Sequence, residues 1–473
     1  MSMAAGLPAR LAASGDPRPA ARIVHLGLGA FFRAFGCTYL SEIGGWGVTG
    51  VSFRSSKVRD ALAPQDFVYT ASERGPAGIR TQAIEVVRDI LVAPENPQAV
   101  LAALCAPQTE IVTLTITEKG YCHDPATRQL NLSHPDILHD LAHTEPRSAP
   151  GYLVRGLAQR RAAGLAPFTV LSCDNLPNNG ELVRRIILDL AKQIDPELSD
   201  WIDRHGAFPS SMVDRIVPAT TDADIRFIEK TSGVHDAAPV HHEPFRQWVI
   251  EKHFLSDRPA FEDVGVQMVD DVRPFEDMKL RMLNGAHSAL SYLGILAGHN
   301  TVSAAVADPL MERYLRGLWT YEIMPTLQAP ANTNLCDYAE QLLNRFANPG
   351  IEHRTDQIAI DGSQKIPQRL LDTIDDRLAM GRPVNRLLLA VAGWIRYTKG
   401  CNDAGDQHEV DDPLQDRLSR AHTKRPDQTV RNFLSIREVF EPAISRQIEA
   451  QLIEIYSGLC RKGAKKMLAQ IER

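Results

Sequence analysis

A short apolar run that ends in two closely spaced glycines opens the regular pattern of this sequence. Arg22 to Leu28 has the composition of a buried β-strand, and Gly27-Leu-Gly29-Ala-Phe-Phe-Arg33 continues from its end. Two glycines at this spacing permit a tight turn and a close approach of the backbone to a pyrophosphate, which the N-terminus of a following helix attracts. The third glycine of the usual fingerprint is missing, with Phe32 in its place, so a plain strand-to-helix turn is the alternative.

Further strand patterns alternate with helical patterns through the first half of the chain. Trp46 to Phe53, Ile111 to Thr117 and Phe168 to Cys173 are apolar and rich in β-branched residues, which favours strands. Pro97 to Cys105 and Glu181 to Ile194 have helical patterns. Strands separated by helices pair in parallel, so the sequence predicts an α/β fold.

The pattern becomes mostly helical after about residue 280. Gln357 to Ile360 is the one modest strand pattern there, and Cys401 to Asp412 has the composition of an exposed loop. The sequence therefore predicts a flexible tail over residues 1–20, a Rossmann-type nucleotide-binding domain over 21–278 and a mostly α-helical substrate-binding domain over 279–473. The helical patterns on which this rests are Pro309 to Tyr321, Asn334 to Arg345, Pro367 to Ala379, Val384 to Tyr397 and Arg437 to Ala469.

Composition excludes several classes of protein. A length of 473 residues suggests two to three domains, and a net charge of −6 gives no electrostatic reason to expect nucleic acid or an anionic membrane as partner. The seven cysteines have no regular spacing, which disfavours a disulfide framework or a zinc ribbon. No long apolar segment and no signal-peptide core occur, so we expect a cytoplasmic protein.

The end of the second predicted strand bears on the choice of cofactor. An NAD enzyme is expected to carry an acidic residue there for the ribose hydroxyls. The chain instead reads Phe53-Arg54-Ser55-Ser56. Arg54 favours a 2′-phosphate, and hence NADP, although an arginine that stacks on adenine is the alternative.

Hydride transfer between an alcohol and a carbonyl needs a group that exchanges the alcohol proton and donors aimed at the developing alkoxide. None of the ten tyrosines has a lysine four residues later, and the cysteines and histidines show no recognisable zinc-ligand spacing. A histidine–aspartate pair stays open as the group that exchanges the proton. The remaining option is a lysine, because a lysine shielded from water has a depressed pKa and becomes a usable base.

Lys279, Asn284 and His287 offer such a set at the predicted domain junction. On an α-helix at about 100° per residue they span an arc of roughly 140°, so we expect them to face one cleft. Lys279 would exchange the proton, Asn284 would donate to the substrate oxygen, and His287 would hold a neighbouring hydroxyl. Spacing alone leaves open a solvated lysine, a helix asparagine and a hydrogen-bonded core histidine.

A second polar cluster, Asp174-Asn175-Leu-Pro-Asn-Asn-Gly180, follows a predicted strand. Ligands bind at the carboxyl ends of the strands in open α/β sheets, so Asn175 is well placed to be a second donor to the carbonyl. An ordinary loop has the same composition.

Six segments resemble the polyol-specific long-chain dehydrogenases, a family that includes mannitol 2-dehydrogenases, arabinitol dehydrogenases and fructuronate reductases. They run nearly from end to end: Ile23-Val-His-Leu-Gly-Leu-Gly-Ala-Phe, Thr115-Ile-Thr-Glu118-Lys-Gly-Tyr121, Ser172-Cys-Asp-Asn175-Leu-Pro, Asp214-Arg-Ile-Val-Pro-Ala-Thr-Thr221, the Lys279/Asn284/His287 set and Asp361-Gly-Ser-Gln-Lys365-Ile-Pro367.

The resemblance implies a Rossmann-type domain followed by a mostly helical domain, an active site between them, NAD as cofactor and no metal. It implies Lys279 as the acid–base group, Asn175 and Asn284 as polarisers of the reacting oxygen, His287 as a substrate ligand and Lys365 in the sugar pocket. Glu276 matches an acidic residue for proton passage, although an exposed carboxylate at a helix start explains it as well. The predicted dinucleotide contacts are Gly27, Leu28, Gly29, Ala30, Phe31, Arg33, Arg54, Glu118 and Asn175; the predicted substrate contacts beside the catalytic residues are Asp214, Arg354, Lys365 and Arg369.

Two departures from the family pattern matter. Phe32 and Phe35 stand where members usually carry histidines, and Gln357 stands where mannitol enzymes carry an arginine. The sequence around Gln357 resembles that of the fructuronate reductases. Arg354 or Arg369 is a candidate to bind a uronate carboxylate, and an ordinary surface arginine is the alternative for each.

We therefore expect a metal-independent, NAD-dependent oxidoreductase that reduces fructuronate to mannonate, with NADP left open. A mannitol 2-dehydrogenase or arabinitol dehydrogenase is the alternative within the enzyme class. A non-catalytic redox sensor is the alternative class, although a sensor has no need of a proton acceptor. The expected partner is a small sugar acid or polyol, and the expected state is a monomer or weak homo-oligomer.

Overall fold

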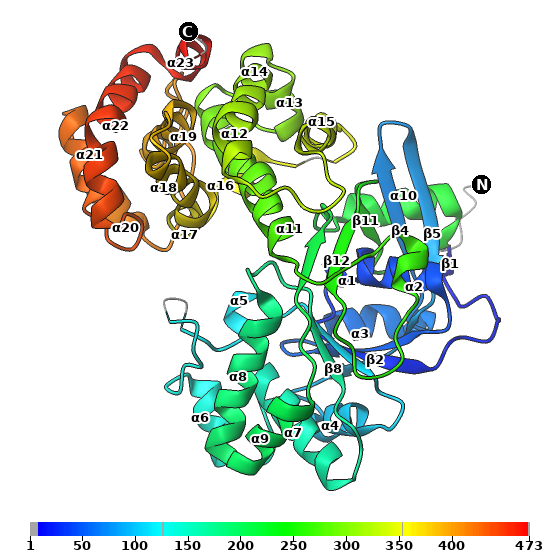
Figure 1. Ribbon diagram of the computed structural model, residues 1–473. Coiled ribbons are helices and arrows are strands. Elements are labelled where there is room, and N and C mark those ends of the chain that lie inside the picture. The colour runs from blue at the N-terminus through cyan, green and yellow to red at the C-terminus, as the bar shows by residue number, and fades with distance from the viewer. Residues whose placement is uncertain (1–7, 125–126, 352, 472–473) are drawn as a thin grey trace, which may run out of the picture. The chain divides into compact units, whose positions relative to one another are not determined.

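The computed structural model of the protein describes residues 8–124, 127–351 and 353–471 (Figure 1). The chain forms two compact units, Met1–Arg273 and Pro274–Arg473, here called the N-terminal and C-terminal units. The N-terminal unit contains the β-sheets, and the C-terminal unit is built from helices. An α/β Rossmann-type part followed by a mostly helical part is the fold class that the sequence predicts.

A five-stranded parallel sheet is the centre of the N-terminal unit. Its strands are, in spatial order, β6 (Val87–Val92), β3 (Gly47–Ser52), β2 (Ala21–Leu26), β7 (Ile111–Leu114) and β8 (Thr169–Ser172). The chain passes from β2 to β3 on one side and later to β7 on the other. The strand order therefore reverses between β2 and β7, which is where ligands bind in such sheets.

Both faces of this sheet are buried, which explains the near-continuous apolar runs of its strands. Val24 and Leu26 belong to one hydrophobic core, and Ile23 belongs to the other. Helices α4 (Pro97–Cys105), α7 (Ala149–Ala162) and α8 (Asn179–Ile194) contribute to the first core and pack beside one another. Helix α2 (Gly36–Ile43) contributes to the second.

Smaller sheets that the sequence analysis missed complete this unit. One has the order β11 (Val240–His242), β4 (Tyr69–Gly75), β5 (Gly78–Ile84), and another has the order β13 (Gln267–Val269), β12 (Gln247–Glu251), β9 (Ser211–Asp214). The remaining elements are α1 (Ala30–Ala34), α3 (Lys57–Leu62), η1 (Ala63–Gln65), α5 (Thr117–Gly120), α6 (Pro135–Ala142), α9 (Pro196–His205), α10 (Asp222–Ser232) and η2 (Phe261–Val264).

The predicted N-terminal tail is in part ordered. Strand β1 (Ala9–Arg10) pairs in parallel with β10 (Val234–His235). Arg18 donates hydrogen bonds to the carbonyl oxygens of Glu85 and Asp66. The described part of the segment, from residue 8, thus packs on the N-terminal unit, because backbone pairing to a strand over two hundred residues away outweighs its Ala/Pro-rich composition.

Helices α12 (Ala286–Leu296), α19 (Asn385–Tyr397) and α22 (Pro442–Lys462) pack in succession in the C-terminal unit. Three segments are π-helical: η3 (Lys279–Gly285), η4 (Leu318–Ile323) and η6 (Pro367–Leu371). The other elements are α11 (Arg273–Met278), α13 (Val302–Val306), α14 (Pro309–Gly317), η5 (Met324–Thr326), α15 (Leu335–Phe346), α16 (Thr355–Ala359), α17 (Gly362–Ile366), α18 (Asp372–Ala379), α20 (Gln415–Ala421), α21 (Pro426–Leu434) and α23 (Ala464–Gln470).

Two predictions for this unit are wrong. The strand expected at Gln357 to Ile360 is the helix α16 instead, whose buried Ile358 and Ala359 give the apolar pattern that suggested a strand. The single helix expected from Arg437 to Ala469 is two helices, because Gly463 has a φ of 80° and ends α22. None of the helices in the described ranges combines the length and apolarity that a bilayer crossing requires.

Candidate active site

The N-terminal unit has a cavity of about 520 Å³ at the carboxyl ends of β2, β3 and β7. The turn after each of these strands contributes to its wall, through Gly27, Leu28 and Gly29, through Ser52 to Ser55, and through Thr115, Ile116 and Thr117. This is the position at which the strand order reverses, so the cavity lies where a dinucleotide is expected in a Rossmann-type sheet.

The two glycines of the first turn have different surroundings. Gly27 has a φ of 92°, and a Cβ added there would lie 2.3 Å from the carbonyl oxygen of Thr115. The hydroxyl of Thr115 in turn donates to the carbonyl oxygen of Gly27 at 3.0 Å. Gly29 has only one atom within 4 Å of such a Cβ, at 3.9 Å. Gly27 therefore lets two turns touch, whereas Gly29 leaves open space beside the backbone for a ligand.

Phe32, which replaces the third glycine of the fingerprint, packs inside the unit. Its ring stacks on that of His25 with the centroids 3.5 Å apart, and a Cβ at Gly36 would lie 2.3 Å from the Phe32 ring. His25 is bound on both ring nitrogens by the hydroxyls of Thr113 and Thr115, and burial lowers its pKa to about 3. Phe32 thus forms part of the packing that fixes β2 to β7. Phe35 likewise packs in the core, against Trp248 and Tyr39.

Asp174 joins the turn after β8 to the turn after β7. Its carboxylate accepts hydrogen bonds from the amides of Ile116 and Thr117 at 2.9 Å each, and from the hydroxyl of Tyr121 at 2.7 Å. Burial is the largest influence on this carboxyl and raises its pKa. The sequence pattern indicates the neighbouring Asn175, which is exposed, as the functional residue of this turn, whereas Asp174 shapes the cavity wall. Its place directly after a strand was the available signal.

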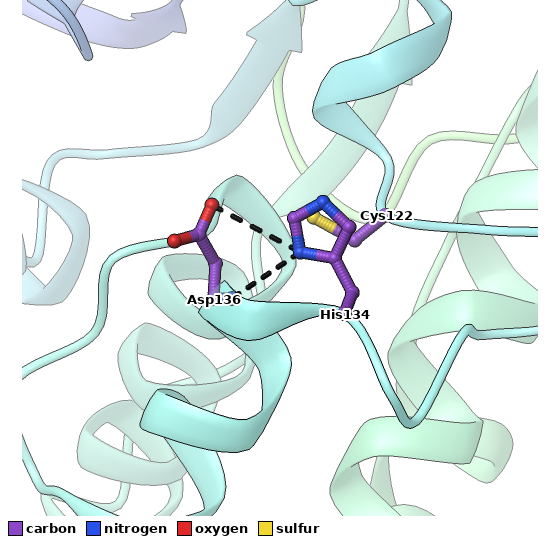
Figure 2. Close-up of side chains that lie close together, drawn as sticks. All are labelled: Cys122, His134 and Asp136. Carbon is purple, nitrogen blue, oxygen red and sulfur yellow. Dashed lines mark hydrogen bonds and ion pairs between the residues drawn. The ribbon is translucent and has the colours of Figure 1, made fainter.

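Cys122, His134 and Asp136 line another part of the cavity, and their potential metal-ligating atoms lie within 4.8 Å of one another (Figure 2). The Nδ1 atom of His134 accepts a hydrogen bond from the amide of Asp136 at 3.2 Å and so caps α6. Burial raises the pKa of the Cys122 thiol to about 12, which disfavours the thiolate that a metal binds. The cluster is a helix cap beside a core thiol and gives no argument for a resident metal.

The ionisable side chains of the cavity wall favour an anionic ligand. Arg54, Lys119 and Arg147 line it, all exposed, and Asp136 is the one carboxylate among the lining residues that the structure describes. Arg54 stands at the end of β3 and makes no side-chain hydrogen bond or ion pair to the described residues. An excess of cations around a concave surface attracts phosphate groups.

Not every predicted dinucleotide contact reaches this cavity. Gly27, Leu28, Gly29 and Arg54 line it. Ala30 and Phe31 begin α1 and do not line it, and Glu118 is exposed on α5 outside it. Arg33 is buried; it donates to the carbonyl oxygen of Ala238 at 2.6 Å and lies over the ring of Tyr69, so the structure gives no support to a phosphate contact there.

Lys279 and Asn284 lie on the π-helix η3, where the sequence predicts an α-helix. Hydrogen bonds in a π-helix join residues five apart, so residues at this spacing lie on successive turns of nearly one face. Lys279 and Asn284 are five residues apart. The predicted arc of roughly 140° between them is therefore wrong, and the two side chains align more closely than an α-helix allows. Lys279 is only 8% exposed and Asn284 is half-buried.

His287 lies just after this segment, on α12, and is 7% exposed. Its ring stacks on Phe346 at a centroid distance of 4.5 Å and meets His353 edge-on at 5.3 Å. Burial lowers its pKa well below the usual value, so the imidazole is neutral. The Nε2 atom is buried and has no hydrogen-bond partner among the described residues, a costly state that a bound hydroxyl would relieve.

The Asp361-Gly-Ser segment fixes the start of α17. Asp361 has a φ of 56°, and a Cβ at Gly362 would lie 2.3 Å from Nε1 of Trp394. The hydroxyl of Ser363 donates to Asp412 at 2.6 Å. Lys365 follows on the same helix.

Lys365 and Arg369 are two largely buried cations of this unit. Lys365 donates through Nζ to the carbonyl oxygen of Ile360 at 2.5 Å, and burial, followed by repulsion from Arg369, lowers its pKa to about 8. Arg369 donates through Nη1 to the hydroxyl of Ser288 at 3.2 Å, and burial lowers its pKa as well. Neither cation has an ion pair with the described residues.

Arg354 has different surroundings. Its side chain is 58% exposed and forms an ion pair with Asp356. Of the two arginines that the sequence nominates for a carboxylate, only Arg369 is half-buried and without an ion pair to the described residues. Among the other predicted residues, Asp214 ends β9 and is 4% exposed, and Glu276 is half-buried on α11, three residues before Lys279.

Comparison with known proteins identifies the family. The mannitol dehydrogenase Rossmann domain matches residues 21–263, and the mannitol dehydrogenase C-terminal domain matches residues 271–457. This chain belongs to the mannitol dehydrogenase family. As a member, it is an oxidoreductase that acts on CH–OH groups, and the resemblance that the motifs predict is confirmed.

Its relatives in the mannitol dehydrogenase family include three informative proteins. The uncharacterized oxidoreductase YeiQ of Escherichia coli is 46% identical over 89% of this chain and 88% of that protein. The D-mannonate oxidoreductase of Escherichia coli is 41% identical over 95% of each. A solved structure of Pseudomonas fluorescens mannitol 2-dehydrogenase, a ternary complex with NAD and D-mannitol, matches with a TM-score of 0.86 and 37% identity over 99% of this chain and 97% of that one.

Proposed function

We propose that this protein interconverts a sugar-derived ketone and a secondary alcohol with NAD(H), uses Lys279 as its acid–base group, and reduces D-fructuronate to D-mannonate. The observation that carries the proposal is the π-helical turn that aligns the buried Lys279 with Asn284, next to a neutral His287 whose Nε2 has no hydrogen-bond partner among the described residues. The 41% identical D-mannonate oxidoreductase supports the choice of substrate.

The cavity of the N-terminal unit fits a nicotinamide dinucleotide. The open backbone at Gly29, the tight turn at Gly27 and the cationic wall suit a pyrophosphate, and the volume of about 520 Å³ is that of a ligand site. Gly27, Leu28 and Gly29 would hold the pyrophosphate, and Arg54 would face the adenosine ribose at the end of β3. When bound, the nicotinamide ring supplies or accepts the hydride.

The residues of the chain would move the proton and orient the reacting oxygen. In the reductive direction the ammonium group of Lys279 gives its proton to the ketone oxygen, and in the oxidative direction the neutral amine takes it back. Asn284 would donate a hydrogen bond to that oxygen and stabilise it as negative charge develops, and Asn175 is the second donor that the family resemblance implies. His287 binds a neighbouring substrate hydroxyl through its Nε2 atom, which has no hydrogen-bond partner in the described part of the chain.

A carboxylate on the substrate would supply the anion that Lys365 and Arg369 lack. Both cations are largely buried, and their hydrogen bonds go to carbonyl and hydroxyl oxygens rather than to acids. A buried cation is stabilised by an anionic partner, and arginine binds carboxylates with two parallel hydrogen bonds. A neutral polyol or ketose would leave the two charges unpaired, so this pair favours a uronate over mannitol or arabinitol.

The test measures NADH oxidation by the purified protein with D-fructuronate, D-tagaturonate, D-fructose and D-xylulose. We expect the highest kcat/KM with D-fructuronate. Turnover of fructose or xylulose alone would overturn the choice of substrate and favour a mannitol 2-dehydrogenase or arabinitol dehydrogenase. No turnover with any of the four, in protein that binds NADH, would favour a redox sensor instead.

A further inference from the structure

The sheet β11-β4-β5 borders a second cavity of the N-terminal unit that the proposed reaction does not use. Its volume is about 500 Å³. It shares no lining residue with the cavity at the carboxyl ends of β2, β3 and β7, here called the dinucleotide cavity. The strand register pairs Glu73 with both Arg80 and His242, so these three side chains project from one face of the sheet. Thr38 and Glu42 of α2 line the cavity as well.

Two of the three arginines that line this cavity are neutralised. Arg246 donates to both carboxylate oxygens of Glu42, at 2.6 Å each. Arg80 lies 3.7 Å from the carboxylate of Glu73 and is largely exposed. The third arginine, Arg215, has no ion pair with any described residue.

Arg215 is buried, with only 7% of its surface exposed. Its Nε donates to the carbonyl oxygen of Glu243, and its Nη1 donates to the carbonyl oxygen of Ala34 and the hydroxyl of Thr38. Its Nη2 makes no hydrogen bond to the described residues. Burial, followed by repulsion from Arg246, lowers its pKa to about 10, so the guanidinium stays charged at neutral pH. The cavity therefore contains a buried cation that has one donor group to spare and no ion pair among the described residues.

His242 provides a buried hydrogen-bond acceptor, whereas Arg215 provides a donor. It is 3% exposed, and its Nδ1 lies 2.9 Å from the carbonyl oxygen of Glu243, which can only accept. Nδ1 therefore carries the hydrogen. Burial, followed by repulsion from Arg215, lowers the pKa of His242 to about 3, so the ring is neutral and its Nε2 is an acceptor. This Nε2 is buried and has no partner in the described part of the chain.

We propose that this cavity binds a small hydroxylated anion, whose carboxylate or phosphate group pairs with Arg215 and whose hydroxyl donates to Nε2 of His242. Sugar acids and sugar phosphates share this chemistry. The inference does not depend on the proposed reaction, because the dinucleotide cavity shares none of these residues.

Isothermal titration calorimetry on the full-length protein saturated with NADH tests the proposal, since NADH then occupies the dinucleotide cavity. The probes are D-gluconate, glucose 6-phosphate and acetate, which has a carboxylate but no hydroxyl. We expect binding of gluconate or glucose 6-phosphate, with the stronger of the two identifying the anionic group, and weaker binding of acetate. The Arg369→Gln variant should bind the preferred probe like the wild type, which separates this site from the proposed substrate site.

Two variants locate the binding. His242→Leu should weaken the binding of the hydroxylated probe by about tenfold, which corresponds to the loss of one hydrogen bond, and leave the binding of acetate unchanged. Arg215→Gln should abolish binding of all three probes, whereas Arg80→Gln, at an exposed arginine, should change little. If Arg215→Gln fails to fold, as judged by circular dichroism, the His242→Leu result decides alone. The proposal is overturned if no probe binds, or if His242→Leu binds gluconate and glucose 6-phosphate as tightly as the wild type.

Discussion

Two arginines in different surroundings bear on the two ligands of the proposed reaction. Arg369 is half-buried, donates to Ser288 and has no ion pair with the described residues. Arg54 is exposed at the end of β3 and lines the dinucleotide cavity, where an NAD enzyme is expected to carry an acid for the ribose hydroxyls. The first surroundings suit a substrate carboxylate, and the second would let the enzyme accept the 2′-phosphate of NADP(H) beside NAD(H). Each can be tested with another arginine as control.

We expect Arg54→Ala to lower kcat/KM for NADPH by about 10- to 100-fold, the range of a charge-assisted hydrogen bond, and to leave kcat/KM for NADH nearly unchanged. The reason is that only NADPH carries a phosphate at this ribose. Steady-state kinetics with both cofactors provide the measurement. Arg59→Ala is the control, since Arg59 is nearby but paired with Asp60 and Glu95. An equal loss with both cofactors would contradict a 2′-phosphate contact.

Arg369 is the proposed ligand of the substrate carboxylate. Arg369→Gln should lower kcat/KM for D-fructuronate by a factor equivalent to roughly 2–5 kcal/mol of transition-state stabilisation, the cost of removing one partner of a desolvated charge pair. Arg354→Gln should have little effect, because Arg354 is exposed and paired with Asp356. Kinetics with D-fructuronate and the neutral D-fructose separate the effects. If the fructose rate falls as much as the fructuronate rate, Arg369 acts on the fold rather than on the carboxylate.

At the scale of elements, the segment Lys279–Gly285 shows where sequence patterns stop being informative. Four strands and the helices α4 and α8 lie close to their predicted bounds, because apolar periodicity and breakers fix them locally. An α-helix and a π-helix have the same residue preferences over one or two turns and differ in the spacing of their hydrogen bonds. That spacing is set by packing: a Cβ at Gly285 would lie 2.9 Å from the carbonyl oxygen of Arg369, so η6 approaches the end of η3 closely.

Gly285 and Gly294 allow a test of this close approach, because a Cβ would be crowded at the first position and not at the second. Gly285→Ala should force η6 and η3 apart and destabilise the protein by about 1–3 kcal/mol, as overpacking does, with a larger fractional loss of activity because Arg369 and Asn284 move. Gly294→Ala on α12 should be neutral or stabilising by about 0.5–1 kcal/mol, because its Cβ would meet only ordinary contacts at 3.4 Å or more. Thermal unfolding and NADH oxidation measure both. Equal changes in stability and activity for the two substitutions would show that the contact between η6 and Gly285 leaves room for a larger side chain.

Across the whole molecule, the sequence predicts the order of the two parts and the place of the dinucleotide cavity. It misses the sheets β11-β4-β5 and β13-β12-β9, because their short strands pair with distant segments rather than with neighbours in the chain. The same reason explains why the sequence assigns no role to Phe32. Its ring stacks on His25 of β2, and the imidazole is held by the hydroxyls of Thr113 in β7 and of Thr115 just after it. Long-range contacts of this kind are not encoded in local periodicity.

Buried neutral histidines should make the protein sensitive to acid. Burial lowers the pKa of His25 and His242 to about 3, and of His241, His353 and His422 to about 4. Between these values and the ordinary value of 6.5, the unfolded chain binds protons that the native protein does not. The free energy of unfolding therefore decreases as the pH falls below about 6.5, with a limiting slope of about 1.4 kcal/mol per pH unit for each histidine.

Urea unfolding at several pH values between about 4.5 and 7.5 measures this slope. His25→Asn should reduce it by one histidine's share, whereas His143→Asn, at an exposed position, should not. A stability that is independent of pH in this range would contradict the burial of these rings.

The proton role of Lys279 is the central claim, and the pH dependence of kcat for D-fructuronate reduction by wild type, Lys279→Ala and Lys424→Ala tests it most directly. Lys424 is an exposed lysine of the same unit and serves as the control. We expect Lys279→Ala to lose about 10²- to 10⁴-fold in kcat, with NADH affinity retained and the ionisation assigned to the lysine absent from the profile. A Lys279→Ala variant that keeps the rate and the pH profile of the wild type would contradict the account.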